Sequence, residues 1–235
     1  MEIVPGIHQV DNVNGNCYII VRSGLTIIDT GIPGSGGKIL AYIRNTLHRD
    51  PSEITTIFIT HFHMDHTGAL SVLKRTAPKA KIAIGEGDAG YLSGKSSPPV
   101  HRGFRGFMLR VAETVMKPGH FVPDIILHDG DQYEGLLCIQ IPGHTPGSFA
   151  FLDELSKSLF AGDILRYDGN KIERGPLQFT MDPGSEDRSI RKIAGLEFET
   201  LLIGHGMPLR PGASRKVREF AGQEGPGMRQ TGTGT

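Results

Sequence analysis

The sequence predicts an α/β fold, and three observations support this prediction. Short runs of β-branched and aromatic residues, such as the one at residues 57–59, are typical of buried strands. Several of these runs end in glycine-framed polar loops that lead into helix-like segments, which is the usual order of elements in α/β folds. A length of 235 residues is sufficient for one large layered domain. We therefore expect a single domain over residues 1–222.

Strands and helices are expected to alternate in the first part of the chain. Residues 3–29 read as short strands divided by turns, with turn signals at Asn14-Gly15 and Ser23-Gly24. The runs at 17–21 and 25–28 are expected to be adjacent antiparallel strands. The following elements are expected in the order helix, strand, helix, strand, helix, at residues 38–48, 57–59, 67–75, 81–84 and 86–92.

The β pattern returns in the second part of the chain. We expect a helix at residues 184–194 and strands at 125–127, 136–141, 148–152, 158–161 and 201–203. Residues 223–235 are rich in glycine and threonine and nearly lack apolar side chains. We therefore expect this segment to be a disordered tail.

Three histidines and an aspartate follow the strand at residues 57–59. In an extended segment, residues i and i+2 point the same way, so His61 and His63 can bind one cation together. Asp65 and His66 stand where the chain turns into a helix and can face a second cation. The strand–loop–helix context favours metal binding over the alternative of a polar loop with solvated histidines.

Three further polar residues, His144, Asp163 and His205, each follow a strand-like run and are framed by glycine. Glycine lets the backbone approach a shared centre closely. We expect Asp163 to bridge two cations. The complete assignment is His61, His63 and His144 on the first cation, and Asp65, His66 and His205 on the second.

The predicted ligands are imidazoles and carboxylates, which favour zinc, with iron or manganese as alternatives, over calcium. Two cations about 3.5–4 Å apart hold a water between them and lower its pKa toward neutrality. The resulting hydroxide attacks an electrophilic carbonyl or phosphorus. Asp65 is the candidate catalytic residue, because its carboxylate can steer this water or accept its proton. No Gly-x-Ser-x-Gly motif indicates serine catalysis.

Residues 93–120 are the best candidate for an insertion, because a Ser/Pro-rich loop at 93–99 precedes a segment with helical periodicity at 102–116. Two interpretations stay open. The helix packs on the body as an ordinary amphipathic element, or it forms a lid over the metal pocket. In the second interpretation, three apolar side chains contact an apolar substrate: Phe104, Phe107 and Met108.

The order of these residues, from the His-x-His-x-Asp-His motif at 61–66 to His144, Asp163 and His205, resembles the metallo-β-lactamase-fold hydrolase superfamily. The resemblance covers residues 2–210, and Asp29-Thr30-Gly31 is similar to a recurrent early element of that family. It implies a four-layer αβ/βα sandwich, in which two mixed β-sheets lie between outer helices. It also implies a site for two metal ions at one edge of the sheets.

Departures from the patterns of individual branches narrow the expected activity. Asp163 stands where the main zinc β-lactamases carry a cysteine, and His63 stands where diiron flavoprotein oxidases carry a glutamate. The chain resembles the glyoxalase II-like and lactonase-like branches, although we expect no helical glutathione-binding domain, because 30 residues follow His205. Lactonases of this fold place a tyrosine at the position of Arg166, so the next residue, Tyr167, is our candidate substrate contact.

The main hypothesis is a dinuclear metal-dependent hydrolase of a small ester, thioester, lactone or phosphoester. The first alternative is a mononuclear iron persulfide dioxygenase, since that group resembles the same pattern and uses one iron and oxygen. The second alternative is a metal-binding module without catalytic activity on the same fold.

Bulk composition favours a small-molecule substrate over a macromolecular partner. Lys+Arg and Asp+Glu balance at 25 each, which predicts no binding to nucleic acid or to an anionic membrane. No export signal or spanning segment is evident, so we expect a cytoplasmic protein. Cys17 and Cys138 are expected to be buried thiols rather than a disulfide. A homodimer is compatible with the sequence.

Overall fold

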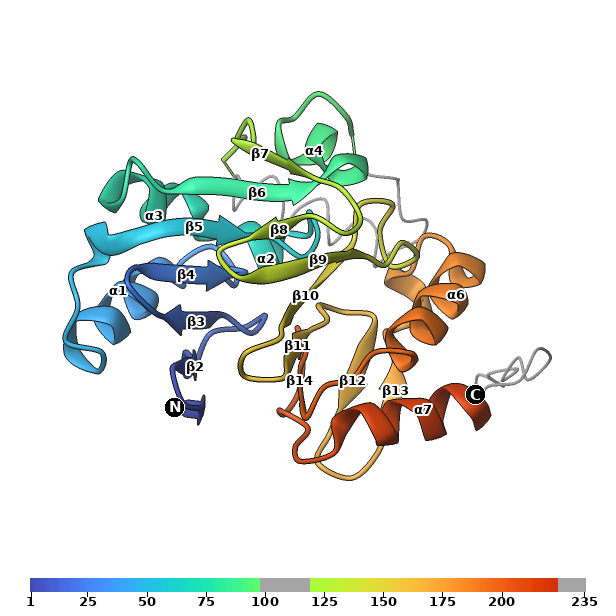
Figure 1. The fold of residues 1–235 in the computed structure, drawn as a ribbon. Coiled ribbons are helices and arrows are strands. Elements are labelled where there is room, and N and C mark those ends of the chain that lie inside the picture. Colours follow the sequence, from blue (N-terminus) through green and yellow to red (C-terminus); the bar gives the residue numbers. More distant parts are fainter. Residues whose placement is uncertain (98–118, 224–235) are drawn as a thin grey trace, which may run out of the picture.

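Seven strands form the first sheet, in the order β1-β2-β3-β4-β5-β6-β7 (Figure 1). The computed structural model describes residues 1–97 and 119–223. Strands β1 to β4 pair antiparallel, whereas β4 to β7 pair parallel, so this sheet is mixed. The strands are β1 (Glu2–Val4), β2 (Ile7–Gln9), β3 (Tyr18–Val21), β4 (Leu25–Ile28), β5 (Ile54–Phe58), β6 (Lys81–Gly85) and β7 (Ile125–Leu127).

The second sheet contains five strands in the order β14-β11-β10-β9-β8. Strands β11 and β14 pair parallel and the other neighbours pair antiparallel. The strands are β8 (Gln132–Tyr133), β9 (Leu136–Gln140), β10 (Phe149–Asp153), β11 (Ser158–Phe160) and β14 (Thr200–Leu202). A separate two-stranded sheet pairs β12 (Leu165–Tyr167) with β13 (Ile172–Arg174).

Three hydrophobic cores define four layers. Successive side chains of a strand point to opposite faces, so in β5 Ile57 enters the core on the helix side of the first sheet and Phe58 enters the core between the sheets. The third core lies between the second sheet and its helices and includes Leu201 and Val217. All four residues of β4 are buried, because both faces of this sheet are covered. The four-layer αβ/βα sandwich is confirmed.

Helices cover the outer face of each sheet (Figure 1). Helix α6 begins after Asp182, whose carboxylate accepts hydrogen bonds from the backbone N–H groups of Gly184 and Ser185. The helices are α1 (Gly36–Asn45), α2 (Met64–Thr67), α3 (Leu70–Thr76), α4 (Glu86–Leu92), α6 (Pro183–Ala194) and α7 (Ala213–Gln223), with 3₁₀ helices at Pro51–Glu53 and Leu177–Phe179. None of the described helices is long and apolar enough to cross a bilayer.

The predicted strands and most predicted helices are present, with the following differences. The helix expected at 38–48 begins at Gly36 and ends at Asn45. The single helix expected at 67–75 is divided into α2 and α3, because Gly68 packs directly against the backbone of Ile32 and Pro33 and donates its N–H to the carbonyl of Gly31. Helix α7 and strands β8, β12 and β13 were not predicted.

One further expectation is confirmed, and two others fall on residues that the structure does not describe. Cys17 and Cys138 are buried free thiols, as predicted. The expected helix at 102–116, with its candidate substrate contacts Phe104, Phe107 and Met108, lies outside the described residues, as does the tail from residue 224. The lid and the tail therefore stay predictions.

Candidate metal centre

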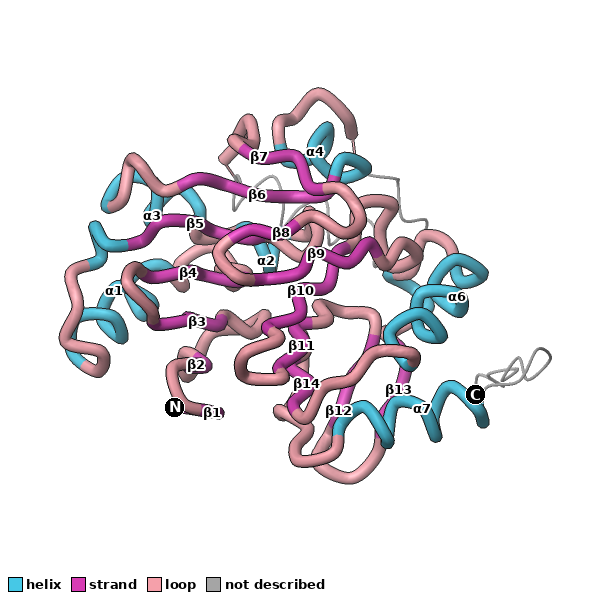
Figure 2. Tube along the Cα trace, in the orientation of Figure 1, coloured by secondary structure: helices cyan, strands magenta, loops and turns pink. Residues whose placement is uncertain are grey.

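The predicted ligands lie beyond the ends of strands from both sheets. Strand β5 ends at Phe58, and three residues later His61 begins the histidine loop, which runs into α2 (Figure 2). The loops that follow β9, β11 and β14 carry His144, Asp163 and His205. The structure brings all seven predicted side chains into three overlapping groups, and within each group the candidate ligand atoms lie within 4.8 Å of one another.

The first group consists of His61, His63 and His144. Nδ1 of His63 lies 3.1 Å from Nε2 of His144, and the three imidazole rings stand roughly edge to face with centroids 4.6–4.8 Å apart. Two nitrogen lone pairs that face each other at this distance repel unless a proton or a cation lies between them. This arrangement fits three neutral imidazoles around one cation.

The second group consists of Asp65, His66 and His205. Nε2 of His205 lies 3.0 Å from Oδ2 of Asp65, and Nε2 of His66 lies 3.9 Å from the same oxygen. Asp163 stands between the two groups. Its Oδ1 lies 3.4 Å from Nε2 of His66, and its Oδ2 lies 3.4 Å from His205 and 3.8 Å from His144. Asp163 therefore occupies the position expected of a bridging carboxylate.

Several of these polar atoms are buried and have no hydrogen-bond partner in the described structure: Nε2 of His61, Nε2 of His66 and Oδ1 of Asp163. Buried polar groups are normally paired, because an unpaired one costs about 1–3 kcal/mol. These three residues form the third group of candidate ligands, which shares His61 with the first group and His66 with the second. A cation is the natural partner for such a set of nitrogen and oxygen atoms, so the residues present fit divalent metal ions.

The electrostatics keep three of the candidate ligands, His63, His144 and Asp163, in the forms that bind metals. Burial lowers the pKa of His63 to about 3 and that of His144 to about 4, so both are neutral at physiological pH. Burial would raise the pKa of Asp163, but His66 and His205 outweigh it and hold that pKa well below its usual range. Burial would lower the pKa of His66, but Asp29, Asp163 and Asp65 outweigh it and raise that pKa well above its usual range. A cation bound by His66 would therefore displace a proton from its imidazole.

Asp29, at the end of β4, orients two of the histidines. Its Oδ2 lies 2.8 Å from Nδ1 of His66 and accepts a hydrogen bond from the hydroxyl of Thr60 at 2.7 Å. That hydroxyl lies 3.0 Å from Nδ1 of His61. Because Thr60 gives its one proton to Asp29, its oxygen accepts from His61. Both histidines therefore carry their proton on Nδ1 and direct the Nε2 lone pair into the site.

Two residues at and just before the start of β3 also hold the loop that carries His205. The side-chain amide of Asn16 donates to the carbonyls of Ile203 and Gly206 at 2.8 and 3.1 Å. The Tyr18 hydroxyl donates to the carbonyl of Ile203 at 2.7 Å. Sequence reasoning missed Asn16, Tyr18 and Thr60 and noted Asp29 only within a recurrent element. Their polarity near strand ends was the available signal, and it does not reveal their partners.

At Gly204 the absence of a side chain lets the backbone approach the metal centre closely, as predicted. A Cβ atom there would lie 2.0 Å from Oδ1 of Asp163 and 2.7 Å from Cε1 of His66, so a side chain is excluded. Tyr167, our candidate substrate contact, lies next to the loop that carries His205, since the Tyr167 carbonyl accepts a hydrogen bond from the N–H of Met207 in that loop. The Tyr167 hydroxyl donates to the carbonyl of Gly169. Its role toward a substrate stays a prediction.

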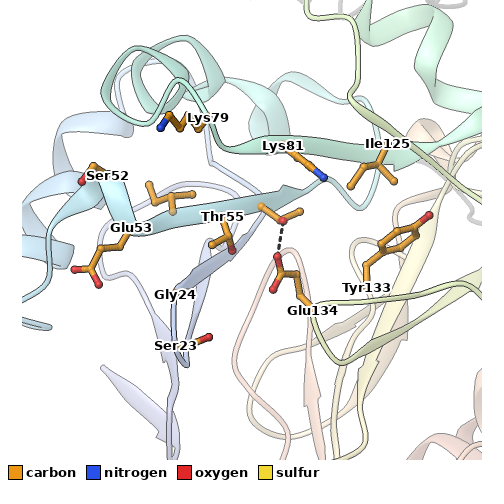
Figure 3. Close-up of a pocket in the computed structure, with 12 residues that line it drawn as sticks. Ser23, Gly24, Ser52, Glu53, Thr55, Lys79, Lys81, Ile125, Tyr133 and Glu134 are labelled. Atoms are coloured by element: carbon orange, nitrogen blue, oxygen red, sulfur yellow. Dashed lines mark hydrogen bonds between the residues drawn. The ribbon is translucent and has the colours of Figure 1, made fainter.

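A groove of about 670 Å³ lies elsewhere, at the starts of the parallel strands β5 and β6 (Figure 3). The hydroxyl of Thr56 donates to Oε1 of Glu134 inside it, at 2.9 Å. Open α/β sheets bind ligands beyond the carboxyl ends of their strands, where the metal centre lies. The groove is lined by Ser23, Gly24, Ser52, Glu53, Ile54, Thr55, Thr56, Lys79, Lys81, Ile125, Tyr133 and Glu134, and none of the seven predicted ligands lines it.

The four-layer sandwich and the His/Asp cluster at its strand ends are the features expected of the metallo-β-lactamase fold. A sequence profile described as the metallo-beta-lactamase superfamily matches residues 10–205. The chain belongs to this superfamily. The predicted family is confirmed.

Three relatives span most of the chain. The uncharacterized protein YobT of Bacillus subtilis is 32% identical over 85% of this chain and 86% of its own length. The probable metallo-hydrolase YflN of the same organism is 28% identical over 88% of this chain and 86% of its own length. The hydroxyacylglutathione hydrolase GloC of Haemophilus influenzae is 26% identical over 94% of this chain and 97% of its own length.

Solved structures share the fold at lower sequence identity. A metallo-beta-lactamase family protein from Thermus thermophilus superposes with a TM-score of 0.69 at 21% identity, over 94% of this chain and 80% of that one. The protein TTHA1623, solved in a di-iron-bound form, superposes with a TM-score of 0.66 at 24% identity, over 91% of this chain and 98% of that one.

Proposed function

We propose that this protein is a dinuclear metal-dependent hydrolase of a small ester, thioester, lactone or phosphoester. One observation carries the proposal: the second group of candidate ligands is as complete as the first, and Asp163 reaches both. A site for one cation needs only the first group. The alternative of a mononuclear iron dioxygenase gives no role to the buried, unpaired Nε2 of His66 in the second group.

When bound, two divalent cations would supply Lewis acidity and lower the pKa of a shared water toward neutrality. His61, His63 and His144 would hold the first cation, and Asp65, His66 and His205 the second, with Asp163 on both. Zinc is our first expectation and iron or manganese the alternatives, because the ligand atoms are nitrogen and oxygen without a thiolate.

Asp65 and Asp163 differ in exposure, and this difference suggests different roles. The Asp65 side chain is 34% exposed, whereas that of Asp163 is 7% exposed. Asp163 is enclosed between imidazoles and is suited to holding cations. Asp65 reaches the open side of the cluster, where its carboxylate can orient a water and accept its proton.

Thioesters are the substrate class that we propose to test first. The relatives include a hydroxyacylglutathione hydrolase and a human acyl-coenzyme A thioesterase, MBLAC2, and both names describe the hydrolysis of an acylated thiol. Nucleic acid and membranes are not proposed as partners, because positive and negative residues balance over the chain.

Elemental analysis combined with a substrate panel tests the proposal. The purified protein should contain close to two divalent metal ions per chain and hydrolyse at least one of a thioester, an aryl ester, a lactone and a phosphodiester. Removal of the metal with a chelator should abolish turnover, and added zinc, manganese or ferrous iron should restore it. One iron per chain together with oxygen uptake on glutathione persulfide would overturn the proposal in favour of the dioxygenase. Tightly bound metal without turnover of any ester class would overturn it in favour of a binding module.

A further inference from the structure

We infer that Asp88 is a positioning residue of the metal centre, whose buried carboxylate fixes the loop carrying His61 and His63 to the loop carrying His144. This inference rests on the proposed function and deepens it, because it names the group that sets the geometry of the first three candidate ligands.

Asp88 lies in the first turn of α4 and is fully buried. Its Oδ2 accepts hydrogen bonds from the backbone N–H of Phe62 at 2.9 Å and from the hydroxyl of Thr145 at 2.7 Å. Its Oδ1 accepts from the backbone N–H of Gly147 at 2.7 Å. Phe62 stands between His61 and His63, and Thr145 directly follows His144. One carboxylate therefore connects both histidine loops.

Helix α4 holds the first loop at a second point. The ring of Tyr91, one turn after Asp88, stacks on the ring of Phe62 with centroids 4.4 Å apart and an angle of 26° between the planes. A hydrogen bond to the Phe62 backbone and a stacking contact with its side chain leave this residue little freedom. Its neighbour His63 is thereby fixed relative to α4.

The second loop lies directly on the helix. A Cβ atom at Gly147 would lie 2.3 Å from the backbone nitrogen of Asp88 and 2.7 Å from its Cγ. A Cβ atom at Gly87 would lie 2.7 Å from the backbone of Pro146. Thr145 is fixed further by Ser148, whose Oγ lies 2.7 Å from its hydroxyl. The space is filled, so Asp88 cannot move without moving the loop that carries His144.

Loop position matters because Nδ1 of His63 and Nε2 of His144 lie 3.1 Å apart across these two loops. Metal–nitrogen bonds of about 2.0–2.1 Å tolerate little displacement of either nitrogen. No ion pair to Asp88 is present in the described parts of the chain, so the buried carboxylate relies on its three donors. A buried charge without a counter-ion is unfavourable for folding. Its three donors all belong to the two histidine loops.

Asp88→Asn and Asp88→Ala test the inference, and Glu86→Gln, an exposed change in the same turn, is the matched control. Metal affinity is measured by competition with a chromophoric chelator, and ligand geometry by the visible absorption of the cobalt-substituted protein. Asparagine keeps one acceptor oxygen and alanine keeps none. We therefore expect both Asp88 variants to bind the cation of the first group about 10- to 100-fold more weakly. Their cobalt spectra should differ from that of the unchanged protein, whereas Glu86→Gln should match it.

Thr145→Val and Thr145→Ser keep the inference testable if the Asp88 variants do not fold. Valine removes the donated hydrogen bond while keeping the shape, and serine retains the hydroxyl. We expect Thr145→Val to weaken metal binding several-fold and alter the cobalt spectrum, and Thr145→Ser to restore both. Unchanged affinity and spectra in folded Asp88 variants, or equal behaviour of the two Thr145 variants, would overturn the inference. Failure of the unchanged protein to bind any cation would instead overturn the proposed function.

Discussion

The carboxylate of Asp29 accepts a hydrogen bond from Nδ1 of His66, with 2.8 Å between the two atoms. Asp29 comes from the first mixed sheet and also controls His61 through the hydroxyl of Thr60. Each cation group thus has one histidine whose tautomer is set by the same aspartate. This relationship makes Asp29 a strong test of how the metal centre is built.

Asp29→Asn should weaken metal binding about 10- to 100-fold, because an amide has one acceptor oxygen, whereas the carboxylate accepts from His66 and the Thr60 hydroxyl through Oδ2 and from the Thr60 N–H through Oδ1. Asn is the informative substitution, since residue 29 has a positive φ of 56° and asparagine tolerates that conformation. Chelator competition measures the affinity. Asp11→Asn, an exposed change, is the control, and equal affinity of the two variants would contradict the prediction.

Asp163→Asn should remove one of the two metal ions or abolish turnover. The neutral amide lowers the negative charge between the groups and leaves one donor nitrogen facing His66 or His205. Metal content by elemental analysis and the rate on the best substrate of the panel measure the effect. A variant with two metal ions and the original rate would refute the bridging role.

Glu186→Gln should remove a pH dependence of stability. Burial raises the pKa of Glu186 to about 7, against the opposing effects of the Thr180 hydroxyl and Arg174. Between its ordinary pKa near 4.5 and about 7, the folded state binds this proton more strongly than the unfolded state, so stability falls as pH rises through that window. Glutamine does not titrate.

Urea unfolding at pH 5 and pH 8 measures this difference. The unchanged protein should lose more stability between the two values than Glu186→Gln. Glu154→Gln, an exposed change on the second sheet's hairpin, should retain the original pH dependence. The same slope in all three proteins would show that Glu186 titrates alike when folded and unfolded.

Phe58→Ala and Phe151→Ala should each cost about 3–5 kcal/mol of unfolding free energy. The two rings are fully buried between the sheets, with centroids 5.0 Å apart. The double variant should cost less than the sum of the single ones, by about 0.5–1.5 kcal/mol, since the rings contact each other. Leu155→Ala, at a side chain that is 85% exposed, should change stability by less than about 0.5 kcal/mol. Additive losses for the Phe pair would show that the contact contributes nothing.

Local patterns were sufficient for most elements. Helix α4 and strand β7 begin and end at the expected residues, because each combines a clear hydrophobic pattern with a polar boundary. Helix α7 was not predicted, although Ala213, Val217 and Phe220 recur at the four- and three-residue steps of a helix. These side chains pack on the third core, between the second sheet and its helices.

The sequence by itself determined which side chains could bind cations, because His61, His63, Asp65 and His66 follow a strand at a spacing that few other sites require. It also determined the family. Only the tertiary structure decided which residues hold these candidate ligands in place. Asp29, Asp88 and Asn16 contact the site through loops distant in sequence, and a hydrogen bond across 59 residues, such as that from Gly147 to Asp88, has no local signature. Local periodicity reflects which face of an element is buried, whereas partnership between loops depends on how the sheets pack.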